Sequence, residues 1–304
     1  MPNPATPNVL VTGASSGIGE ACTRHFLSRG WQVFAGVRSH EAAARLRAAS
    51  PDRCIPLQLD VTQPEEIEAA MDEVRTRVGK AGLRGLVNNA GIAVAGPMEH
   101  VSLDRFRTQL EINVFGPVAM SQACLPLLRQ GKGRIVNMSS VSGRVAYPFL
   151  GPYAASKHAL EALSDSMRVE LLPWGLHVSL IVAGAIDTPA WRKSVADARQ
   201  TIAAMPEAAR EGYGPPMQAL MAQLDGPQGI PPSAVARTVE RALVENRPRA
   251  RYSVGDTRTS RILRRLPDRL RDALILRALP GWGDPATIAT RKNRKDHQHA
   301  DCGG

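Results

Sequence analysis

Residues 8–19, NVLVTGASSGIG, decide the fold of this chain of 304 residues. The run NVLVT is short and apolar, which is typical of a buried strand, and it leads directly into a glycine-rich turn. After the turn, apolar side chains recur at helical spacing, at Ile18, Cys22, Phe26 and Leu27. The sequence therefore predicts a strand, a tight turn and a helix in direct succession.

The turn itself, TGASSGIG at residues 12–19, has glycines spaced for binding a dinucleotide. Such glycines let the chain turn sharply, bring its backbone against a diphosphate and pack the new helix on the sheet, while the helix N-terminus attracts the anion. The expected cofactor contacts here are Gly13, Ser15, Ser16, Gly17, Ile18 and Gly19. The alternative is a tight structural turn that binds nothing, but the position between a strand and a helix favours a dinucleotide.

Strand and helix patterns alternate from this turn to residue 257. Further strands are expected at residues 31–38, 54–61, 83–91, 133–140, 176–184 and 250–255. The helices between them are expected at residues 40–49, 64–78, 102–129, 153–172 and 231–247. This alternation predicts an α/β fold, a doubly wound parallel sheet with helices on both faces, and a single domain over residues 1–257.

Two segments depart from the alternation. Residues 189–230 hold several Pro and Gly among short helical patterns, which favours a mobile lid over a site. Residues 258–304 form a basic extension, and for residues 258–280 three alternatives stay open: an amphipathic helix on an anionic membrane surface, a helix packed on this domain or on a second copy, and a partly disordered segment. The last fifteen residues are polar and charged, and we expect them to be disordered.

The composition argues against several classes of function. The net charge is +10, but from Arg258 onward eleven Arg or Lys stand against five Asp, which leaves +4 for the rest of the chain. Aromatic residues make up 4% and form no stacking platform among basic residues, so nucleic-acid binding is not expected. No apolar run of about 18 residues predicts a membrane span.

The N-terminus and the cysteines indicate a reducing compartment. The start, MPNPATPNV, lacks the charged and apolar segments of a signal peptide, which predicts a cytoplasmic protein. The cysteines are widely spaced, with no CxxC motif or Cys/His cluster, at positions Cys22, Cys54, Cys124 and Cys302. We therefore expect reduced thiols and no metal site.

Tyr153 and Lys157, within LGPYAASKH at residues 150–158, are the candidate catalytic pair. Side chains four residues apart share one face of a helix. Lowering a tyrosine pKa from about 10 to about 7 requires stabilising the phenolate by roughly 4 kcal/mol, which a nearby ammonium in a partly dry cleft can supply. Taken alone, the pattern YxxxK is common by chance and also fits a surface Tyr and Lys.

The end of the second strand, WQVFAGVRSH, distinguishes between the two nicotinamide dinucleotides. Proteins that use NAD typically place a carboxylate there for the ribose hydroxyl, whereas the 2′-phosphate of NADP needs a cation. This chain has Val37 and Arg38 at that point and no acid. A guanidinium suits a phosphate, so NADP(H) is preferred. If Arg38 stacks on the adenine instead, NAD(H) fits equally well.

Six motifs occur in order: TGASSGIG, LDVT, NNAG, the region of Asn113, the serine strand GRIVNMSS, and YAASK. With these motifs, residues 8 to about 255 resemble the short-chain dehydrogenase/reductase family, in the type with a core of about 250 residues. The resemblance implies a Rossmann fold, a nicotinamide cofactor, and hydride transfer between the nicotinamide and an alcohol or carbonyl carbon.

The resemblance also implies a catalytic tetrad of Asn113, Ser140, Tyr153 and Lys157. Ser140 would hold the substrate oxygen, Tyr153 would exchange a proton with it, and Lys157 would lower the tyrosine pKa and bind the nicotinamide ribose. Ser140 is chosen over the neighbouring serines because the family's serine lies thirteen residues before its tyrosine. The cofactor contacts implied outside the glycine turn are Asp60, Val61, Asn89, Ala90, Gly91, Gly184, Ile186 and Thr188.

Asn113 lies within the long predicted helix, four residues before Pro117. Because Pro117 has no N–H, the carbonyl of Asn113 lacks its intrahelical partner. We expect Gly116 and Pro117 to kink the helix and expose this carbonyl. In the family, the backbone here holds a water that relays protons to the lysine.

Five residues carry further expectations that the structure can test. Where the family usually has Pro-Gly after its strand, this chain has Ala183 and Gly184, which predicts a looser turn. His158 points about 100° away from Lys157 around the helix, which favours a packing or surface role. Glu161 and Asp165 are expected to be solvated helix charges.

The stretch GWQVFAGVR, the run PFLGPYAASKHALEALSDSMRVEL and the extended C-terminus resemble the branch that includes 17β-hydroxysteroid and retinol dehydrogenases. This implies that the substrate is a small molecule with a bulky hydrophobic body. The candidate residues that line its site are Val94, Met98, Val145, Tyr147, Phe149, Trp191 and Met205. The family also implies a homodimer or homotetramer that packs the helices around residues 102–129 and 153–172. The alternatives are an NAD(H)-dependent dehydrogenase acting on another carbonyl substrate and a non-catalytic NADP(H)-sensing protein.

Overall fold

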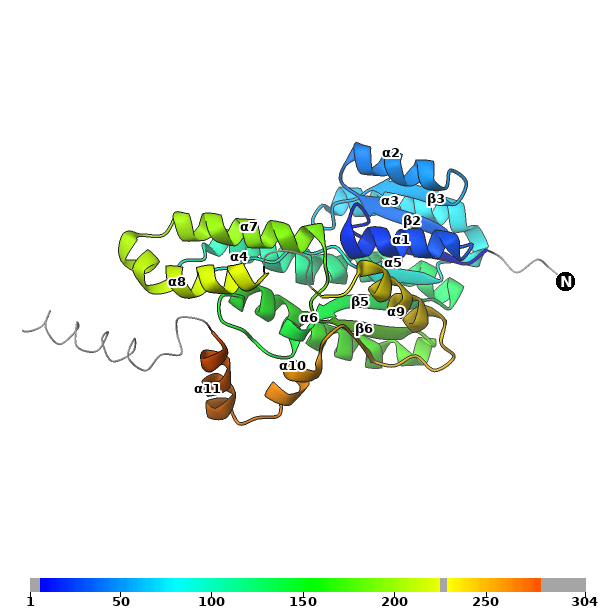
Figure 1. The fold of residues 1–304 in the computed structure, drawn as a ribbon. Helices are drawn as coiled ribbons and strands as arrows, with labels where there is room; N and C mark the ends of the chain where they lie inside the picture. The colour runs from blue at the N-terminus through cyan, green and yellow to red at the C-terminus, as the bar shows by residue number, and fades with distance from the viewer. Residues whose placement is uncertain (1–5, 225–228, 280–304) are drawn as a thin grey trace, which may run out of the picture.

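The computed structural model of this chain describes residues 6–224 and 229–279 (Figure 1). Part of the predicted lid, residues 225–228, lies outside the described residues. So does most of the basic extension, residues 280–304, with Cys302 and the final segment for which we expect disorder.

Seven parallel strands form one sheet in the order β3-β2-β1-β4-β5-β6-β7. The strands are β1 (Asn8–Val11), β2 (Gln32–Val37), β3 (Cys54–Gln58), β4 (Gly85–Asn88), β5 (Arg134–Ser140), β6 (His177–Ala183) and β7 (Arg251–Val254). The chain builds outward from β1 to β3 and then crosses back to β4, so the direction of winding reverses between β1 and β4. This confirms the predicted doubly wound sheet and places a ligand-binding crevice at the carboxyl end of β1.

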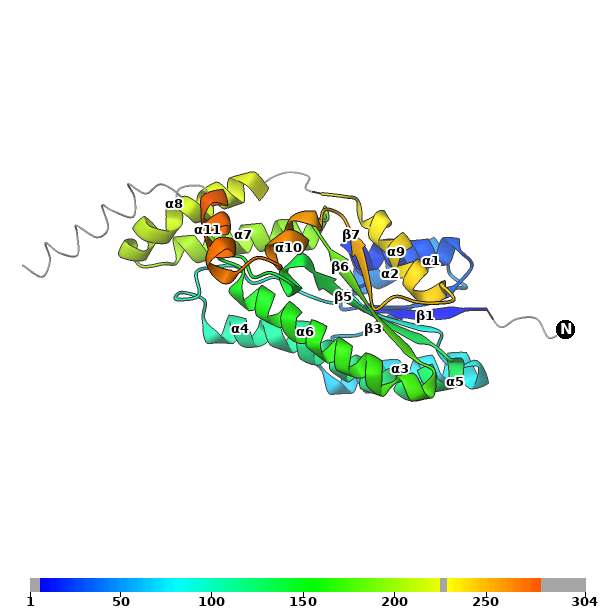
Figure 2. The same cartoon turned by 90° about the horizontal axis from the view of Figure 1, so that it is seen from below.

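Helices cover both faces of the sheet (Figure 2). One face carries α1 (Gly17–Ser28), α2 (His40–Ala49) and α9 (Pro232–Val244), and the other carries α3 (Pro64–Val78), α5 (Gly116–Gly131) and α6 (Gly151–Glu170). Val9 and Val11 pack toward the first group while Leu10 packs toward the second, as alternation along a strand requires. Burial on both faces explains why these strands are almost continuously apolar. Short helical turns occur at Gly79–Ala81, Val141–Gly143 and Leu172–Trp174.

The single long helix expected at residues 102–129 is divided in three. It comprises α4 (Leu103–Leu110), a π-helical turn at Glu111–Phe115, and α5. In the π-helical turn, the N–H of Gly116 donates to the carbonyl of Glu111, five residues earlier. The irregularity predicted from Gly116 and Pro117 is therefore present and lies directly before them.

The lid differs from its prediction. In place of short helical pieces, it contains two long helices, α7 (Pro189–Ala203) and α8 (Glu207–Leu224), which lie side by side beyond the strand ends (Figure 1). Pro215 and Pro216 are among the prolines that favoured short helical pieces, yet they lie inside α8. Met217 and Met221 follow them and are buried in an apolar cluster with α7 residues, and this packing outweighs the missing N–H groups.

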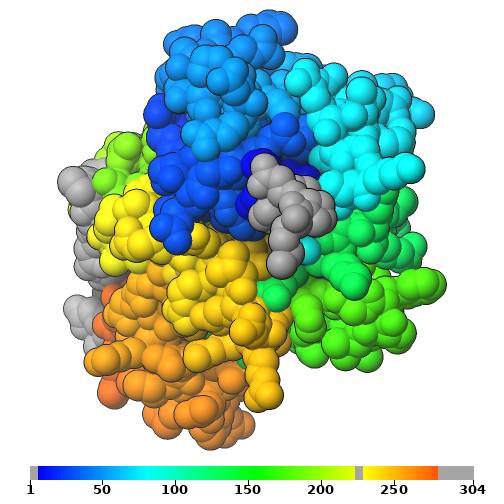
Figure 3. Space-filling view, turned by 90° about the vertical axis from the view of Figure 1, so that its right-hand side faces the viewer, coloured from blue at the N-terminus to red at the C-terminus, as the bar shows by residue number. Residues whose placement is uncertain are grey.

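In the described residues up to 279, two helices follow β7: α10 (Arg258–Leu263) and α11 (Asp268–Ala278). The residues after β7, orange in the space-filling view, lie on the same side of the molecule as the yellow α9 residues (Figure 3). Ile275 and Leu279 pack into the apolar cluster of the lid, so α11 is a helix packed on the domain, which was one of the three alternatives. Within the described part of the chain, no helix is both long and apolar enough to cross a membrane.

Candidate active site

The glycine turn between β1 and α1 has the geometry of a diphosphate cradle. Gly13 and Gly17 have φ angles of +64° and +56°, in the left-handed region that glycine adopts without strain. A Cβ atom on Gly19 would lie 2.1 Å from the carbonyl oxygen of Gly13, so only glycine lets α1 start this close to the turn. With this geometry, the N-terminus of α1 is suited to bind an anion that lies against the backbone of the turn.

The remaining residues of the turn lie around this backbone. Ser16 is exposed, directly precedes α1 and makes no capping hydrogen bond with its side chain. The carbonyl of Ser15 accepts a hydrogen bond of 2.6 Å from Arg45 of α2. Ile18 is partly buried and packs against the core cluster under α1.

Asn89, which follows β4, holds the glycine turn in place. Its side-chain amide donates to the carbonyls of Thr12 (2.9 Å) and Gly13 (3.1 Å), while the hydroxyl of Thr12 accepts from the backbone N–H groups of Asn89 and Ala90. The amide nitrogen of Asn89 is therefore engaged by the glycine turn. A Cβ on Gly91 would lie 3.3 Å from the Asn113 amide oxygen, which keeps this loop close to the π-helical turn.

Arg38 and Asp60 lie together at the ends of β2 and β3. The Arg38 side chain is 69% exposed, and its guanidinium is 3.4 Å from the Asp60 carboxylate. Burial alone would raise the pKa of Asp60, but hydrogen bonds from Thr62 and the charge of Arg38 hold it below its usual value. Val61 is buried against Gly116, so its side chain is part of the core and only its backbone can meet a cofactor.

The loop after β6 closes the other side of the crevice. A Cβ on Gly17 would lie 3.2 Å from the Cβ of Thr188, so this loop touches the glycine turn. Gly184 donates to the carbonyl of Val254, and Ile186 pairs with Ile230 in an isolated bridge. These backbone contacts hold the turn at Ala183–Gly184, which lacks the family's proline, and the looser turn that we expected there stays a prediction.

Ser140, Tyr153 and Lys157 come together between the end of β5 and the first turns of α6. Ser140 lies near enough to the Tyr153 phenol to lower its pKa. The Lys157 ammonium donates to the carbonyl of Met138 at 2.8 Å and lies 5.7 Å from the centroid of the Tyr153 ring. Of the nearby serines, Ser139 bonds to Glu161 and Ser142 makes a backbone bond to Ser140, so Ser140 is the one directed at the phenol.

The protonation of this pair differs from our expectation. Burial raises the pKa of Tyr153, against an opposite effect of its hydrogen bond with Ser140, and burial lowers the pKa of Lys157 to about 8. The expected lowering of the tyrosine pKa by Lys157 is not found, because desolvation outweighs an ammonium that is engaged by the Met138 carbonyl. Tyr153 therefore holds its proton at neutral pH, in the form that can donate to a carbonyl oxygen.

Asn113 lies in the π-helical turn and is fully buried. Its amide oxygen accepts from the N–H of Ile92, and its amide nitrogen donates to the carbonyl of Ile92, both at 2.9 Å. The amide also donates to the Ser156 hydroxyl on α6 at 3.2 Å. The side chain thus joins three elements of the site and is not directed at a substrate.

Gln109 and Ser156 are two site residues that the sequence analysis missed. The Gln109 amide accepts from the N–H of Val94 (2.6 Å) and donates to the carbonyl of Ile92 (2.8 Å). Asn113, one helical turn later, also bonds to Ile92. The spacing of four residues between Gln109 and Asn113 on one helix was the available signal. Together these amides hold the loop after β4 against α6.

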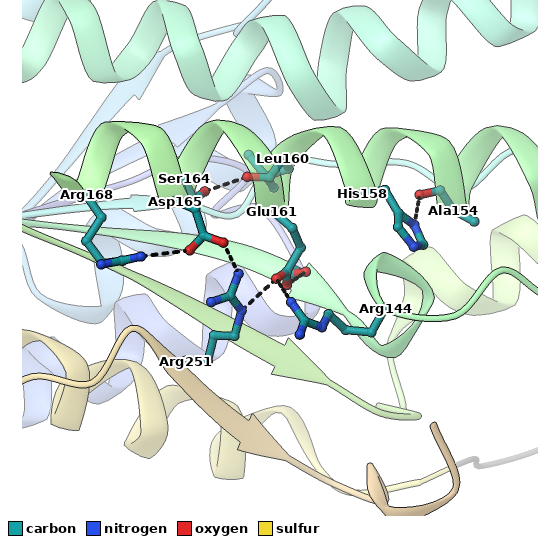
Figure 4. Close-up of polar contacts among 10 residues, drawn as sticks. Arg144, Ala154, His158, Leu160, Glu161, Ser164, Asp165, Arg168 and Arg251 are labelled. Atoms are coloured by element: carbon teal, nitrogen blue, oxygen red, sulfur yellow. Dashed lines mark hydrogen bonds and ion pairs between the residues drawn. The ribbon is translucent and has the colours of Figure 1, made fainter. Parts of the chain in front are cut away.

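Glu161 is not the solvated charge that we expected, whereas the Asp165 side chain is 42% exposed but paired with two arginines. Glu161 is 5% exposed and bonds to Ser139, Arg144 and Arg251, and Asp165 bonds to Arg251 and Arg168 (Figure 4). A helix-surface pattern could not reveal this, because the partners come from other elements. His158 is exposed and bonds back to the carbonyl of Ala154, in agreement with a surface role.

The apolar candidates divide into buried and accessible residues. The buried ones are Val94, Val145, Phe149 and Met205. Phe149 and Met205 belong to the lid cluster, and Trp191 of α7 packs against it with an indole N–H that is buried without a partner among the described residues. Met98 is 57% exposed, and its sulfur would lie 2.3 Å from a Cβ on Gly151, so it covers the start of α6. Tyr147 is partly buried.

The thiols agree with the prediction where the structure describes them. Cys22, Cys54 and Cys124 are buried and free. Burial raises the pKa of Cys22 and Cys124 to about 12 and that of Cys54 to about 11. In the described ranges, no His, Cys, Asp and Glu side chains gather in threes at a position to hold a metal ion.

Comparison with known proteins identifies the family. A family model described as short chain dehydrogenase matches residues 7–199. An NADPH-dependent 3-dehydrocapnine reductase of Ornithobacterium rhinotracheale is 37% identical, over 89% of this chain and 96% of its own length. Retinol dehydrogenase 5 of Mus musculus is 34% identical, over 90% and 88%. The crystal structure of a short-chain dehydrogenase from Streptomyces avermitilis aligns with a TM-score of 0.72 and 30% identity, over 90% of this chain and 96% of that one. The chain therefore belongs to the short-chain dehydrogenase family.

Proposed function

We propose that this protein is an NADP(H)-dependent oxidoreductase that transfers hydride between the nicotinamide and a secondary alcohol or ketone of a bulky hydrophobic substrate. The observation that carries the proposal is that Ser140 at the end of β5 lies near Tyr153 and Lys157 on α6, with the Lys157 ammonium 5.7 Å from the centroid of the Tyr153 ring. The nicotinamide cofactor supplies the hydride when bound. Ser140 then holds the substrate oxygen, Tyr153 gives it a proton in reduction or takes one in oxidation, and Lys157 binds the ribose of the cofactor.

The preference for NADP(H) is supported by Arg38. Its side chain is 69% exposed and carries a cation at the end of β2, where a 2′-phosphate would lie. The 37% identical relative is named as NADPH-dependent. Asp60 is already bound by Thr62, so its carboxylate competes only weakly for Arg38 at 3.4 Å.

Arg38→Ala tests this preference. We expect the variant to weaken NADPH binding about 10- to 100-fold, because it loses one charge-assisted phosphate contact worth roughly 1.5–3 kcal/mol. NADH binding should change little. Cofactor titration by fluorescence measures both constants. Arg47→Ala, an exposed arginine near the end of α2, is the control. An equal loss for both cofactors would refute the phosphate contact and favour NAD(H) use.

The hydrophobic substrate is supported by the lid. Phe149, Trp191 and Met205 form an apolar cluster beyond the strand ends, where α7 and α8 cover the site. A relative at 34% identity is named a retinol dehydrogenase. Cofactor consumption with steroid ketones, retinal, aryl ketones and small aliphatic ketones tests the substrate class. We expect kcat/KM to rise with apolar size; turnover of only the small ketones, or of none, would contradict the proposal.

A homodimer or homotetramer is proposed from the faces around α5 and α6. Phe115 is 56% exposed and Val169 is 59% exposed, which leaves large apolar side chains in water in a single copy. Light scattering after size-exclusion chromatography should give a dimer or tetramer mass for the native chain and a monomer mass for Phe115→Asp with Val169→Asp. A monomeric native chain would overturn this proposal.

Peripheral contact of a cytoplasmic protein with an anionic membrane is proposed for residues 258–280, of which Pro280 lies outside the described part. Exposed apolar side chains occur on α10 and α11, with Ile262 at 62% and Leu270 at 50% exposure, among several arginines. Native protein should sediment with phosphatidylglycerol vesicles and not with phosphatidylcholine vesicles. Leu270→Ser should weaken binding and Val244→Ser, on α9, should not; equal sedimentation of both variants would contradict this contact.

A further inference from the structure

Glu161 is a buried carboxylate that the proposed chemistry does not use. It lies on α6 one turn beyond Lys157 and two turns beyond Tyr153, and it is 5% exposed. It accepts hydrogen bonds from the Ser139 hydroxyl (2.6 Å), an Arg144 guanidinium N–H (3.0 Å) and an Arg251 guanidinium N–H (2.8 Å). Figure 4 shows the two guanidinium groups meeting this carboxylate beside α6.

Two of these partners flank the turn that contains Ser140. Ser139 precedes Ser140 on β5, and Arg144 follows the short helical turn Val141–Gly143. One carboxylate therefore bonds to both ends of this turn. A Cβ on Gly143 would lie 3.1 Å from the Lys157 carbonyl and 3.2 Å from the Glu161 Cγ, so the turn is packed directly on α6.

The third partner anchors the carboxylate from the far side. Arg251 begins β7, and its second guanidinium nitrogen bonds to Asp165 at 2.6 Å. Burial alone would lower the pKa of Arg251, but the hydrogen bonds to Asp165 and Glu161 raise it. The charge of Glu161 is thus balanced by two guanidinium groups, which a carboxylate at this depth requires.

We propose that Glu161 is a positioning residue that holds the Ser140 turn in its place beside the phenol of Tyr153. Tyr153 and Glu161 belong to one rigid helix, so bonds from Glu161 to Ser139 and Arg144 fix the Ser140 turn relative to the phenol. Asp165 shares Arg251 with Glu161 but touches neither end of the turn. The proposal rests on the proposed function, in which Ser140 holds the substrate oxygen.

Glu161→Gln tests the proposal against Asp165→Asn as the matched control. The amide keeps the shape of the side chain but offers one acceptor atom in place of two. We expect kcat to fall about 10- to 100-fold in Glu161→Gln, with KM for NADPH within about twofold of the native value, because a displacement of about 1 Å in a site costs this much. Asp165→Asn should stay within about threefold of native in kcat. A Glu161→Gln kcat equal to that of Asp165→Asn would overturn the proposal.

Hydrogen exchange gives a readout that needs no substrate. The amides of Ser142, Arg144 and Val145 are bonded within the turn, so they should exchange at least about tenfold faster in Glu161→Gln and unchanged in Asp165→Asn. Absence of turnover in the native protein would defeat the proposed function, and exchange would still decide whether Glu161 holds the turn. Faster exchange with an unchanged kcat would overturn the positioning role.

Ser139→Ala serves if Glu161→Gln does not fold. It removes one hydrogen bond and leaves both guanidinium groups paired with Glu161. We expect kcat to fall about threefold to tenfold with an unchanged melting temperature, and the double variant with Glu161→Gln, where it folds, to be no slower than Glu161→Gln alone. A kcat that Ser139→Ala leaves unchanged, or losses that multiply in the double variant, would contradict a common action through the turn.

Discussion

At the scale of single residues, Lys157 shows that the site is arranged at the expense of stability. Its ammonium is buried with one protein acceptor, the Met138 carbonyl, and burial lowers its pKa from 10.5 to about 8. Each pKa unit corresponds to about 1.4 kcal/mol, so keeping this proton at pH 7 costs on the order of 3 kcal/mol. A hydrophobic residue of similar length avoids that cost and leaves one carbonyl unpaired, which costs about 1 kcal/mol.

Lys157→Met should therefore stabilise the protein by about 1–2 kcal/mol at pH 7 while it abolishes turnover. Between pH 8 and 10.5 the unfolded chain binds the lysine proton and the native chain does not, so native stability rises with pH through this window. The advantage of the variant should shrink accordingly by pH 10. Urea unfolding at both pH values measures it, with Lys80→Met, an exposed lysine, as control. A variant less stable than the native protein at pH 7 would contradict the claim that burying the Lys157 charge lowers stability.

The residues that sequence alone could identify are those with fixed spacing along one element. Tyr153 and Lys157 are four apart on one helix, whereas Ser140, on β5, was chosen from the resemblance, by the family's spacing between serine and tyrosine. Glu161 could not be identified, because its burial depends on Arg251, 90 residues away along the chain. The pKa of Tyr153 was also out of reach, since desolvation is a property of the folded site.

At the scale of elements, the start of α5 shows how tightly one helix is fitted to the cofactor edge. A Cβ on Gly116 would lie 2.7 Å from Cγ2 and 3.1 Å from Cβ of Val61, a β-branched side chain that cannot swing aside. Alanine gains about 1 kcal/mol of helix propensity over glycine, whereas overpacking of this kind costs about 1–3 kcal/mol. The steric cost of alanine at position 116 should therefore exceed its gain in helix propensity.

Gly116→Ala should lower the free energy of unfolding by about 1 kcal/mol, and adding Val61→Ala should reduce the penalty that alanine at 116 imposes. Thermal unfolding of the native chain, both single variants and the double variant measures the coupling. Independent, additive effects would show that these two side chains do not meet as described.

The order of strands and helices was predictable because each has a strong periodic pattern, and Gly116 with Pro117 marked the irregular turn. The lid helices were not, because Pro215 and Pro216 are helix breakers by local rules. The cost of these two prolines is outweighed by the packing of Met217 and Met221 on α7 and α11, in a cluster that forms only in the folded chain.

At the scale of the whole molecule, the parallel sheet brings candidate residues from five of its strands to one edge. The glycine turn follows β1, Arg38 follows β2, Asn89 follows β4, Ser140 ends β5 and Thr188 follows β6. Alternation of strands and helices was enough to predict this convergence, since parallel strands end on the same side. The covering of that edge by α7, α8 and α11 could not be predicted, because it depends on apolar contacts across the lid.

The central claim is that hydride passes to a carbonyl carbon while Tyr153 protonates its oxygen. Reduction of the best ketone substrate with NADPH deuterated on the transferred face of C4 tests it directly, in native protein, Tyr153→Phe, and Tyr252→Phe as a control whose hydroxyl bonds to Glu245 away from the site. We predict deuterium on the carbinol carbon of the native product, a fall in kcat of about 10²- to 10⁴-fold in Tyr153→Phe with NADPH binding retained, and little change in the control. A Tyr153→Phe protein that reduces the ketone at the native rate, or a product without deuterium, would contradict the account.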